Sequence, residues 1–188
     1  KLDSLRFFQA LHYSEALKLY IGFITSMTST DILLKMIDFS DGNLHDIAHF
    51  MKVHGYAQAI AKAEGLDKDT VELIEVAALV HDIACPLCRL KYGNTNGKYQ
   101  ELEGIELTKE FLKDTGYSDK FIERVAYLVG HHHTLNAIDG IDYQILIEAD
   151  YLVNADESKY SKENIANMAE KYFKTKTGLA MLKSIYKL

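Results

Sequence analysis

Apolar residues along this chain recur three and four positions apart, and strict alternation of apolar and polar positions is nowhere sustained. The first spacing places side chains on one face of an α-helix, whereas alternation is typical of a half-buried strand. A single proline and eleven glycines leave little to interrupt helices. The pattern therefore predicts an all-α fold, and the chain carries no internal repeat or low-complexity tract.

Turn and capping residues set the boundaries of the expected helices. Thr30 and Ser118 are N-cap residue types that precede apolar runs, Asp41-Gly42-Asn43 is a turn, and Gly65 ends a long helix. In chain order the predicted helices are Ser14–Met27, Thr30–Asp38, Leu44–Glu64, Asp67–His81, Gln100 to just before Gly116, a Ser118-capped helix running into His131–His133, Asp142–Asn154, Lys162–Tyr172 and Leu179–Tyr186. The apolar stretch before His81 predicts that the Asp67–His81 helix is deeply buried.

Two segments are expected to be loops. Arg89–Tyr99 is rich in glycine, asparagine and lysine and has no periodicity, which predicts a flexible lid over a site. Thr134–Gly140 is the second loop. We expect the side chains of both segments to set substrate specificity.

Length and charge limit the classes of protein to consider. The 188 residues, 48% of them apolar, suit one globular unit, with residues 1–40 as N-terminal helices packed on a domain of residues 41–188. A net charge of −6 without a basic run makes nucleic acid and anionic membranes poor partners. With no apolar membrane span, no signal peptide and only two cysteines, we expect a cytoplasmic protein. We further expect a monomer or a homodimer.

Buried acids are the first sign of chemistry. His81-Asp82 follows a buried stretch, and Asp150 lies within the apolar sequence ILIEADYLV. An ionised carboxylate in such surroundings costs several kcal/mol unless it is hydrogen-bonded or bound to a cation. A divalent metal is one solution, and a helix cap or a Lys or Arg partner is the simpler one.

The sequence pattern alone does not decide which histidines lie beside these acids. His49 and His54 lie on different stripes of the Leu44–Glu64 helix, and periodicity does not choose between them. His45 and His49 are four apart, a spacing at which two imidazoles on one helix can share a metal, although the pair alone favours solvated or core histidines. His132 and His133 are expected on the core face of their helix, where they meet a phosphate or a second metal.

The Cys85-Pro86-Leu87-Cys88 element has the spacing of a redox or zinc motif. A redox CxxC usually follows a strand, and a structural zinc site needs further cysteine or histidine ligands nearby. The sequence favours spectator thiols here, with a metal role or a thiol-redox protein as the alternatives.

In order and separation, His49-Phe50-Met51-Lys52-Val53, His81-Asp82 and Glu148-Ala149-Asp150 resemble the HD superfamily of metal-dependent phosphohydrolases. Lys52 stands where that family usually has arginine. The likeness spans about residues 41–186, and segments 91–104, 131–154 and 173–178 add likeness to bacterial HD hydrolases of unassigned substrate. It implies an HD-domain, phosphodiesterase-like helical bundle, and it selects His49 over His54.

The resemblance implies that His49, His81, Asp82 and Asp150 bind one divalent ion, of Fe, Mn, Ni, Co, Zn or Mg. Relatives with two metals carry a further histidine shortly after HD, where this chain has Gln100, so one ion is favoured over two. The implied reaction is hydrolysis of a small phosphate ester, expected to be a nucleotide, by a metal-activated water.

Further roles follow as expectations from the same mechanism. Asp82 orients the water, and His132 and His133 hold phosphoryl oxygens or protonate the leaving group. Phosphate contacts are expected from Lys52, Lys91, Lys98 and His131, and support of the site from Gln100, Glu103 and Glu148. The alternative is a nucleotide-binding regulatory HD protein with little or no turnover.

Overall fold

The computed structural model describes residues 26–188, and within that range the chain is built of α-helices without a strand. The helices are α3 (Ser29–Phe39), α4 (Leu44–Ala63), α5 (Lys68–Val80), α6 (Cys85–Tyr92), α7 (Gly97–Leu112), α8 (Asp119–Val129), α9 (Ile141–Glu157), α10 (Lys162–Lys171) and α11 (Lys176–Tyr186). The predicted all-α fold is confirmed. The helix expected over Ser14–Met27 lies outside the described residues except for Ser26 and Met27, which are not helical.

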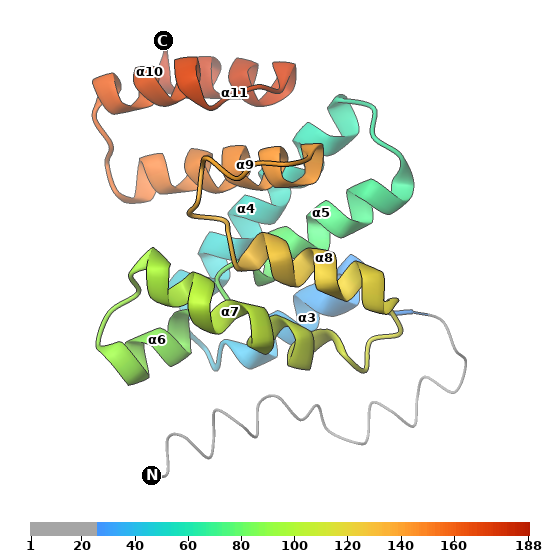
Figure 1. Ribbon diagram of the computed structural model, residues 1–188. Helices are drawn as coiled ribbons and strands as arrows, with labels where there is room; N and C mark the ends of the chain where they lie inside the picture. The colour runs from blue at the N-terminus through green and yellow to red at the C-terminus, as the bar shows by residue number, and fades with distance from the viewer. Residues whose placement is uncertain (1–25) are drawn as a thin grey trace.

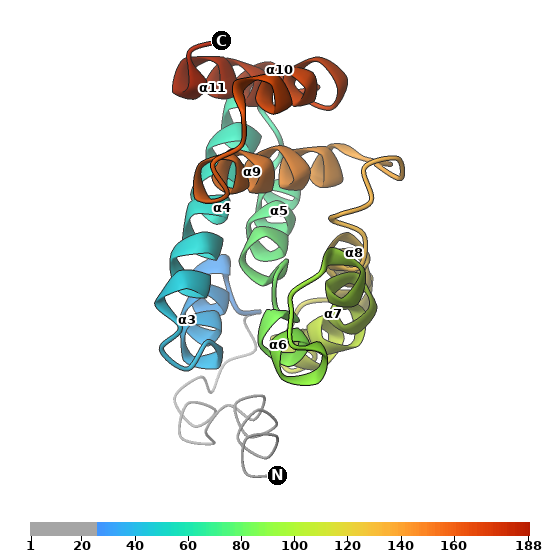
Figure 2. The ribbon, with the colours of Figure 1, turned by 90° about the vertical axis from the view of Figure 1, so that its left-hand side faces the viewer.

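The centre of the molecule is formed by α4, α5 and α9. Helices α4 and α5 run alongside each other, and α9 crosses both beneath the α10–α11 pair (Figures 1 and 2). This arrangement covers α9 on both sides, and all residues from Tyr143 to Val153 are buried. The stretch Val76–Val80 is fully buried as predicted. Site residues on these helices therefore sit in apolar surroundings.

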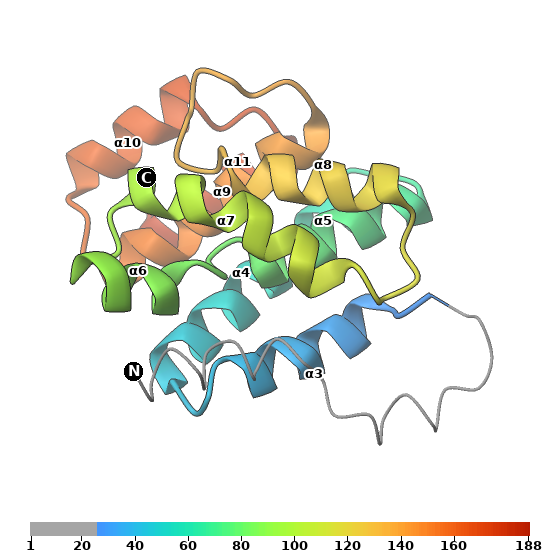
Figure 3. The same ribbon diagram turned by 60° about the horizontal axis from the view of Figure 1, so that its bottom comes forward.

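Helices α7 and α8 pack side by side as a second layer, and α3 lies against α5 (Figure 3). Ile32, Met36 and Phe39 of α3 belong to the same apolar cluster as the buried residues of α5 and α9. The described part of the N-terminal forty residues thus shares one core with the rest of the chain. No helix within residues 26–188 is long and apolar enough to cross a membrane.

The prediction that Arg89–Tyr99 forms a loop is wrong for most of that segment. Helix α6 already covers Cys85–Tyr92, with Pro86 in its first turn, and Gly93 ends it in a left-handed conformation at φ 70°. Asn96 then caps α7, which begins at Gly97. Only residues 93–96 connect the two helices, because the glycine and the asparagine act as helix ends.

Other helix ends differ by a few residues from the prediction. Thr28, not Thr30, caps α3, in a reciprocal capping box with Asp31. Helix α8 ends at Val129, so the three histidines lie in the turn after it. Helix α9 continues past Asn154 to Glu157, and α11 begins at Lys176. The Ser118 cap and the Thr134–Gly140 connection are confirmed.

Candidate metal centre and its cavity

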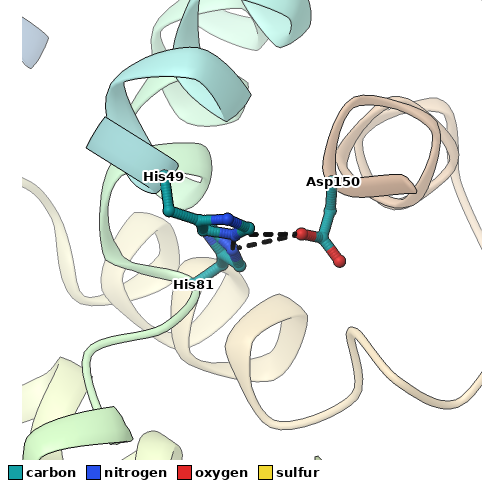
Figure 4. A group of neighbouring side chains, drawn as sticks. All are labelled: His49, His81 and Asp150. Carbon is teal, nitrogen blue, oxygen red and sulfur yellow. Dashed lines mark hydrogen bonds and ion pairs between the residues drawn. The ribbon is translucent and has the colours of Figure 1, made fainter. Parts of the chain in front are cut away.

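Three buried side chains from three different segments converge at the centre of the molecule (Figure 4). His49 projects from α4, His81 follows the last residue of α5, and Asp150 projects from α9. His49 Nε2 lies 3.2 Å from His81 Nε2 and 3.3 Å from Asp150 Oδ1. His81 Nε2 lies 3.5 Å from the same Asp150 oxygen. All three residues are less than 9% exposed.

A hydrogen bond on the far side of each imidazole fixes which ring nitrogen faces the centre. His81 Nδ1 lies 2.8 Å from the carbonyl of Ala78, so it carries the proton and donates it. His49 Nδ1 lies 2.8 Å from the Glu157 carboxylate and donates in the same way. Asn154 Nδ2 donates to Asp150 Oδ1 at 2.7 Å. Both histidines therefore turn Nε2 toward the acid.

Asp82 connects this group to a second one. Its Oδ2 lies 3.6 Å from His49 Nε2 and 3.7 Å from His81 Nε2, while its Oδ1 lies 3.4 Å from His132 Nε2. His132 Nδ1 donates to the carbonyl of Val129 at 2.7 Å, and its buried Nε2 has no hydrogen-bond partner. Asp82, His132 and His133 bring their ligand atoms within 4.8 Å of one another.

The charges in this region shift several pKa values. Burial disfavours the charged form of His49, but the carboxylates of Asp150, Asp82 and Glu157 outweigh it and raise the His49 pKa to about 9. Burial opposes ionisation of Asp82 and Asp150 as well, yet the surrounding histidines hold the pKa of both acids well below the usual range.

The two histidines of the second group are shifted in opposite directions. Burial lowers the pKa of His132, but Asp82 outweighs it and raises that pKa overall. Although part of the His133 ring is exposed, partial loss of solvent and then neighbouring His132 lower its pKa to about 4. His133 is therefore neutral at pH 7, whereas His132 binds a proton more readily than a free imidazole does.

This donor set fits a divalent cation. With Nδ1 of His49 and of His81 donating elsewhere, each ring, when it is neutral, turns a lone pair toward the oxygens of Asp150 and Asp82. Lone pairs that meet at 3.2–3.7 Å repel unless a proton or a cation lies between them. Mixed imidazole and carboxylate ligands are those that first-row divalent metals prefer. The arrangement is thus consistent with a metal site at His49, His81 and Asp150, with Asp82 beside it.

An open cavity of about 550 Å³ gives access to this centre. His49, Asp82 and Asp150 line its floor together with His133. Its walls come from α4, α6, the α6–α7 connection, α7, α9, the α9–α10 connection and α10. They include His45, Asp46, Arg89, Thr95, Gln100, Tyr151, Asn154, Glu157, Tyr160 and Asn164. The volume lies within the range of small-molecule sites.

The groups expected to bind phosphate are not brought to this cavity. Lys52 pairs with Glu157, Lys91 lies 2.6 Å from Glu103, and Lys98 is exposed in the first turn of α7. His131 Nδ1 donates to the carbonyl of Tyr127, and its ring stacks on that tyrosine. None of these four residues lines the cavity. The acids that pair with Lys52 and Lys91 lie on other helices, which a sequence does not reveal.

Only one of the three supporting residues lies at the cavity. Gln100 is buried there, and its Nε2 donates to the carbonyl of Thr95. Glu103 instead accepts from Lys91 and Tyr92. Glu148 points toward the C-terminal helices, where it accepts from the backbone N–H groups of residues 174 and 175.

Several residues that line the cavity are not among those predicted from the sequence, and Asp46, Arg89, Asn154 and Glu157 are the charged and amide ones nearest the three ligands along the chain. Asp46 lies one helical turn before His49, and its partner Arg89 was assigned to the expected loop. Asn154 and Glu157 follow Asp150 at spacings of four and seven on α9. That periodicity was sufficient to place both on the Asp150 face, had the helix been extended beyond Asn154.

The remaining candidates lie apart from the centre or are inert. His54 lies 3.9 Å from Glu75, in a separate polar group. Cys85 and Cys88 are free buried thiols, and burial raises the pKa of each above its ordinary value. Protonated, buried thiols are poor nucleophiles, which disfavours the thiol-redox alternative.

The comparisons with known proteins agree with this geometry. A family model described as the HD domain matches residues 46–165. A crystal structure of a predicted HD superfamily hydrolase from an uncultured Thermotogales bacterium is similar over 85% of this chain and 83% of that one. Its TM-score is 0.60 and its sequence identity is 25%. None of the curated proteins compared matches the sequence.

Proposed function

Because this chain belongs to the HD domain family, we propose that it is a metal-dependent phosphohydrolase. The substrate is a small phosphate ester, a nucleotide in the first instance, and the reaction is hydrolysis by a metal-activated water. One divalent ion is held by His49, His81, Asp82 and Asp150. The ion is Fe, Mn, Ni, Co, Zn or Mg, a choice that ligand affinity and cellular supply make together.

One observation carries this proposal. Nε2 of His49, Nε2 of His81 and Oδ1 of Asp150 meet within 3.5 Å, and the second nitrogen of each ring is already engaged by a carboxylate or a carbonyl. A buried centre of this kind, next to an open cavity, supports the proposal of a cation site. Open coordination positions distinguish catalytic from structural metal sites.

When bound, a divalent ion supplies polarisation of a phosphoryl oxygen and lowers the pKa of a water molecule toward neutrality. The chain's own residues orient the reactants around it. Asp82 directs Oδ2 to the three-residue group and Oδ1 to His132, so it is placed to accept a hydrogen bond from the attacking water. Its low pKa keeps it an acceptor at neutral pH.

His132 and His133 take different parts in this scheme. Because Asp82 raises the pKa of His132, that residue is the better group to protonate a leaving oxygen. The lowered pKa of His133 makes it a neutral hydrogen-bond partner for an equatorial phosphoryl oxygen. Arg89 is the one arginine or lysine among the described residues that line the cavity, so it replaces the predicted lysines as the phosphate cation.

A turnover screen tests the proposal. The metal-stripped chain is reloaded with Mn²⁺, Ni²⁺, Co²⁺ or Mg²⁺ and assayed against nucleotides, dinucleoside polyphosphates and a chromogenic phosphodiester. We expect metal-dependent phosphate release from at least one class, and loss of that release in His81→Ala. Tight nucleotide binding without turnover under any metal contradicts the enzyme and favours the regulatory alternative.

A further inference from the structure

His49 differs from the other inward-facing histidines in how its ring is held. His81 and His132 each donate Nδ1–H to a backbone carbonyl three residues earlier, at 2.8 and 2.7 Å. Both lie just past a helix end, where the last carbonyls have no helical partner. His49 lies inside α4, where the backbone carbonyls already accept helical hydrogen bonds. Its ring therefore needs an acceptor from another helix.

Glu157 supplies that acceptor from the last turn of α9. Its Oε2 lies 2.8 Å from His49 Nδ1, and its Oε1 accepts from Lys52 Nζ. Lys52 stands three residues after His49 on α4, so the same helix that carries the imidazole also holds the carboxylate that orients it. The Glu157 side chain is 18% exposed, whereas neighbouring Asp156 is 68% exposed and pairs with Lys159 in solvent.

The contact also joins the two helices that carry the ligands. Asp150 precedes Glu157 on α9, and both face α4. A shift of α9 along α4 would therefore change the His49–Asp150 and His49–Glu157 distances together. A simple surface ion pair adds little to stability and nothing to the orientation of a ring.

We propose that Glu157, clamped by Lys52, is a positioning residue that fixes the tautomer and the orientation of the His49 ring. With Nδ1–H donated to Glu157, the Nε2 lone pair faces Asp150 and the divalent ion. The inference rests on the metal site of the proposed function, and it adds a residue that the ligand set does not contain.

The test compares metal affinity in four variants of the full chain, each stripped and titrated with Co²⁺ against a chelator. Glu157→Ala removes the acceptor and is expected to weaken Co²⁺ binding about 10- to 100-fold, the usual effect of losing a partner behind a ligand histidine. Glu157→Gln keeps a neutral acceptor and is expected to lose less. Lys52→Met leaves Glu157 unclamped and should show a smaller loss again. Asp156→Asn is the matched control on the same helix and should retain wild-type affinity.

A second measurement distinguishes positioning from a structural role. In the Zn²⁺-loaded protein, long-range nitrogen–proton NMR spectra should show the His49 proton on Nδ1 in wild type and a changed Nδ1 signal in Glu157→Ala. Leaving the His49 Nδ1–H donor without its acceptor costs about 1–3 kcal/mol, so the metal-free melting temperature should fall by no more than about 12 °C.

Three results would overturn the inference. Equal Co²⁺ affinity in Glu157→Ala and Asp156→Asn refutes the positioning role and leaves the metal site standing. Weakened binding together with a large fall in the metal-free melting temperature assigns Glu157 to fold stability instead. Failure of the wild-type chain to bind a divalent ion overturns the proposed function and this inference together.

Discussion

Replacing Glu148 with alanine is predicted to destabilise the C-terminal helices without weakening metal binding. Glu148 is fully buried, two residues before Asp150 on α9, yet its carboxylate faces the opposite way. Its Oε1 accepts from the backbone N–H groups of Lys174 and Thr175, at 2.6 and 2.9 Å. Its Oε2 accepts from the hydroxyl of Thr175, the N-cap of α11.

The size of the effect follows from the donors left behind. The alanine variant leaves two backbone N–H groups without an acceptor, and each unsatisfied buried donor costs about 1–3 kcal/mol. We therefore expect a loss of about 4 kcal/mol in the free energy of unfolding. At about 2–4 °C per kcal/mol for a chain of this length, the melting temperature falls by about 8–16 °C. Glu148→Gln should lose less, because its amide oxygen still accepts and its NH₂ group can donate to the Thr175 hydroxyl.

Urea and thermal unfolding of the metal-stripped variants, followed by circular dichroism, measure this loss. Co²⁺ affinity is measured on the same samples well below their melting temperatures, and it should stay within about twofold of wild type, because Glu148 contacts no proposed ligand. A large loss of affinity without a loss of stability would show that Glu148 supports the metal, as first expected from the sequence. Its placement at the C-terminal helices would then be refuted.

Three further predictions concern the centre and the cavity. The His49 pKa is raised from 6.5 to about 9, so its contribution to the stability of the metal-free chain is present in full below pH 6.5. That contribution, about 3 kcal/mol, is lost as pH rises through 9; urea midpoints across this range should fall in wild type by more than in His49→Gln. Because burial raises the pKa of both thiols, Cys85 and Cys88 should alkylate far more slowly at pH 8 in the folded chain than in urea; equal rates would contradict their burial. A Cβ at Gly97 would lie 2.5 Å from His133 Cδ2; Gly97→Ala should therefore displace that ring and lower kcat while metal content stays at the wild-type level, and unchanged kinetics would argue against a catalytic role for His133.

The helices were predictable because local signals set them. Spacing of apolar residues and the Ser118 cap located α8, and the Asp41-Gly42-Asn43 turn located the start of α4. The prediction for the segment after Cys88 was wrong because it relied on composition instead of on such signals. Glycine, asparagine and lysine suggested one long loop, whereas Gly93 and Asn96 close one helix and open the next. Composition alone does not distinguish loop residues from helix-end residues.

The convergence of His49, His81 and Asp150 was predicted from the resemblance to the HD family. That resemblance identifies the ligands but not the side chains that surround them. The partners of the lysines were not predictable, since Lys52 and Lys91 are held by acids on α9 and α7. Such pairs form between helices distant in sequence, so no local pattern records them. Glu157 was within reach of periodicity but lay beyond the predicted end of α9.

The metal content of purified variants tests the central claim most directly. Wild type, His81→Ala, Asp150→Ala and the control Asp156→Asn are loaded with a divalent ion, desalted and analysed by elemental mass spectrometry, with circular dichroism confirming that each is folded. We predict a stoichiometric divalent ion in wild type and in Asp156→Asn, and its loss from the other two. Unchanged stoichiometric metal in both His81→Ala and Asp150→Ala would contradict the proposed centre.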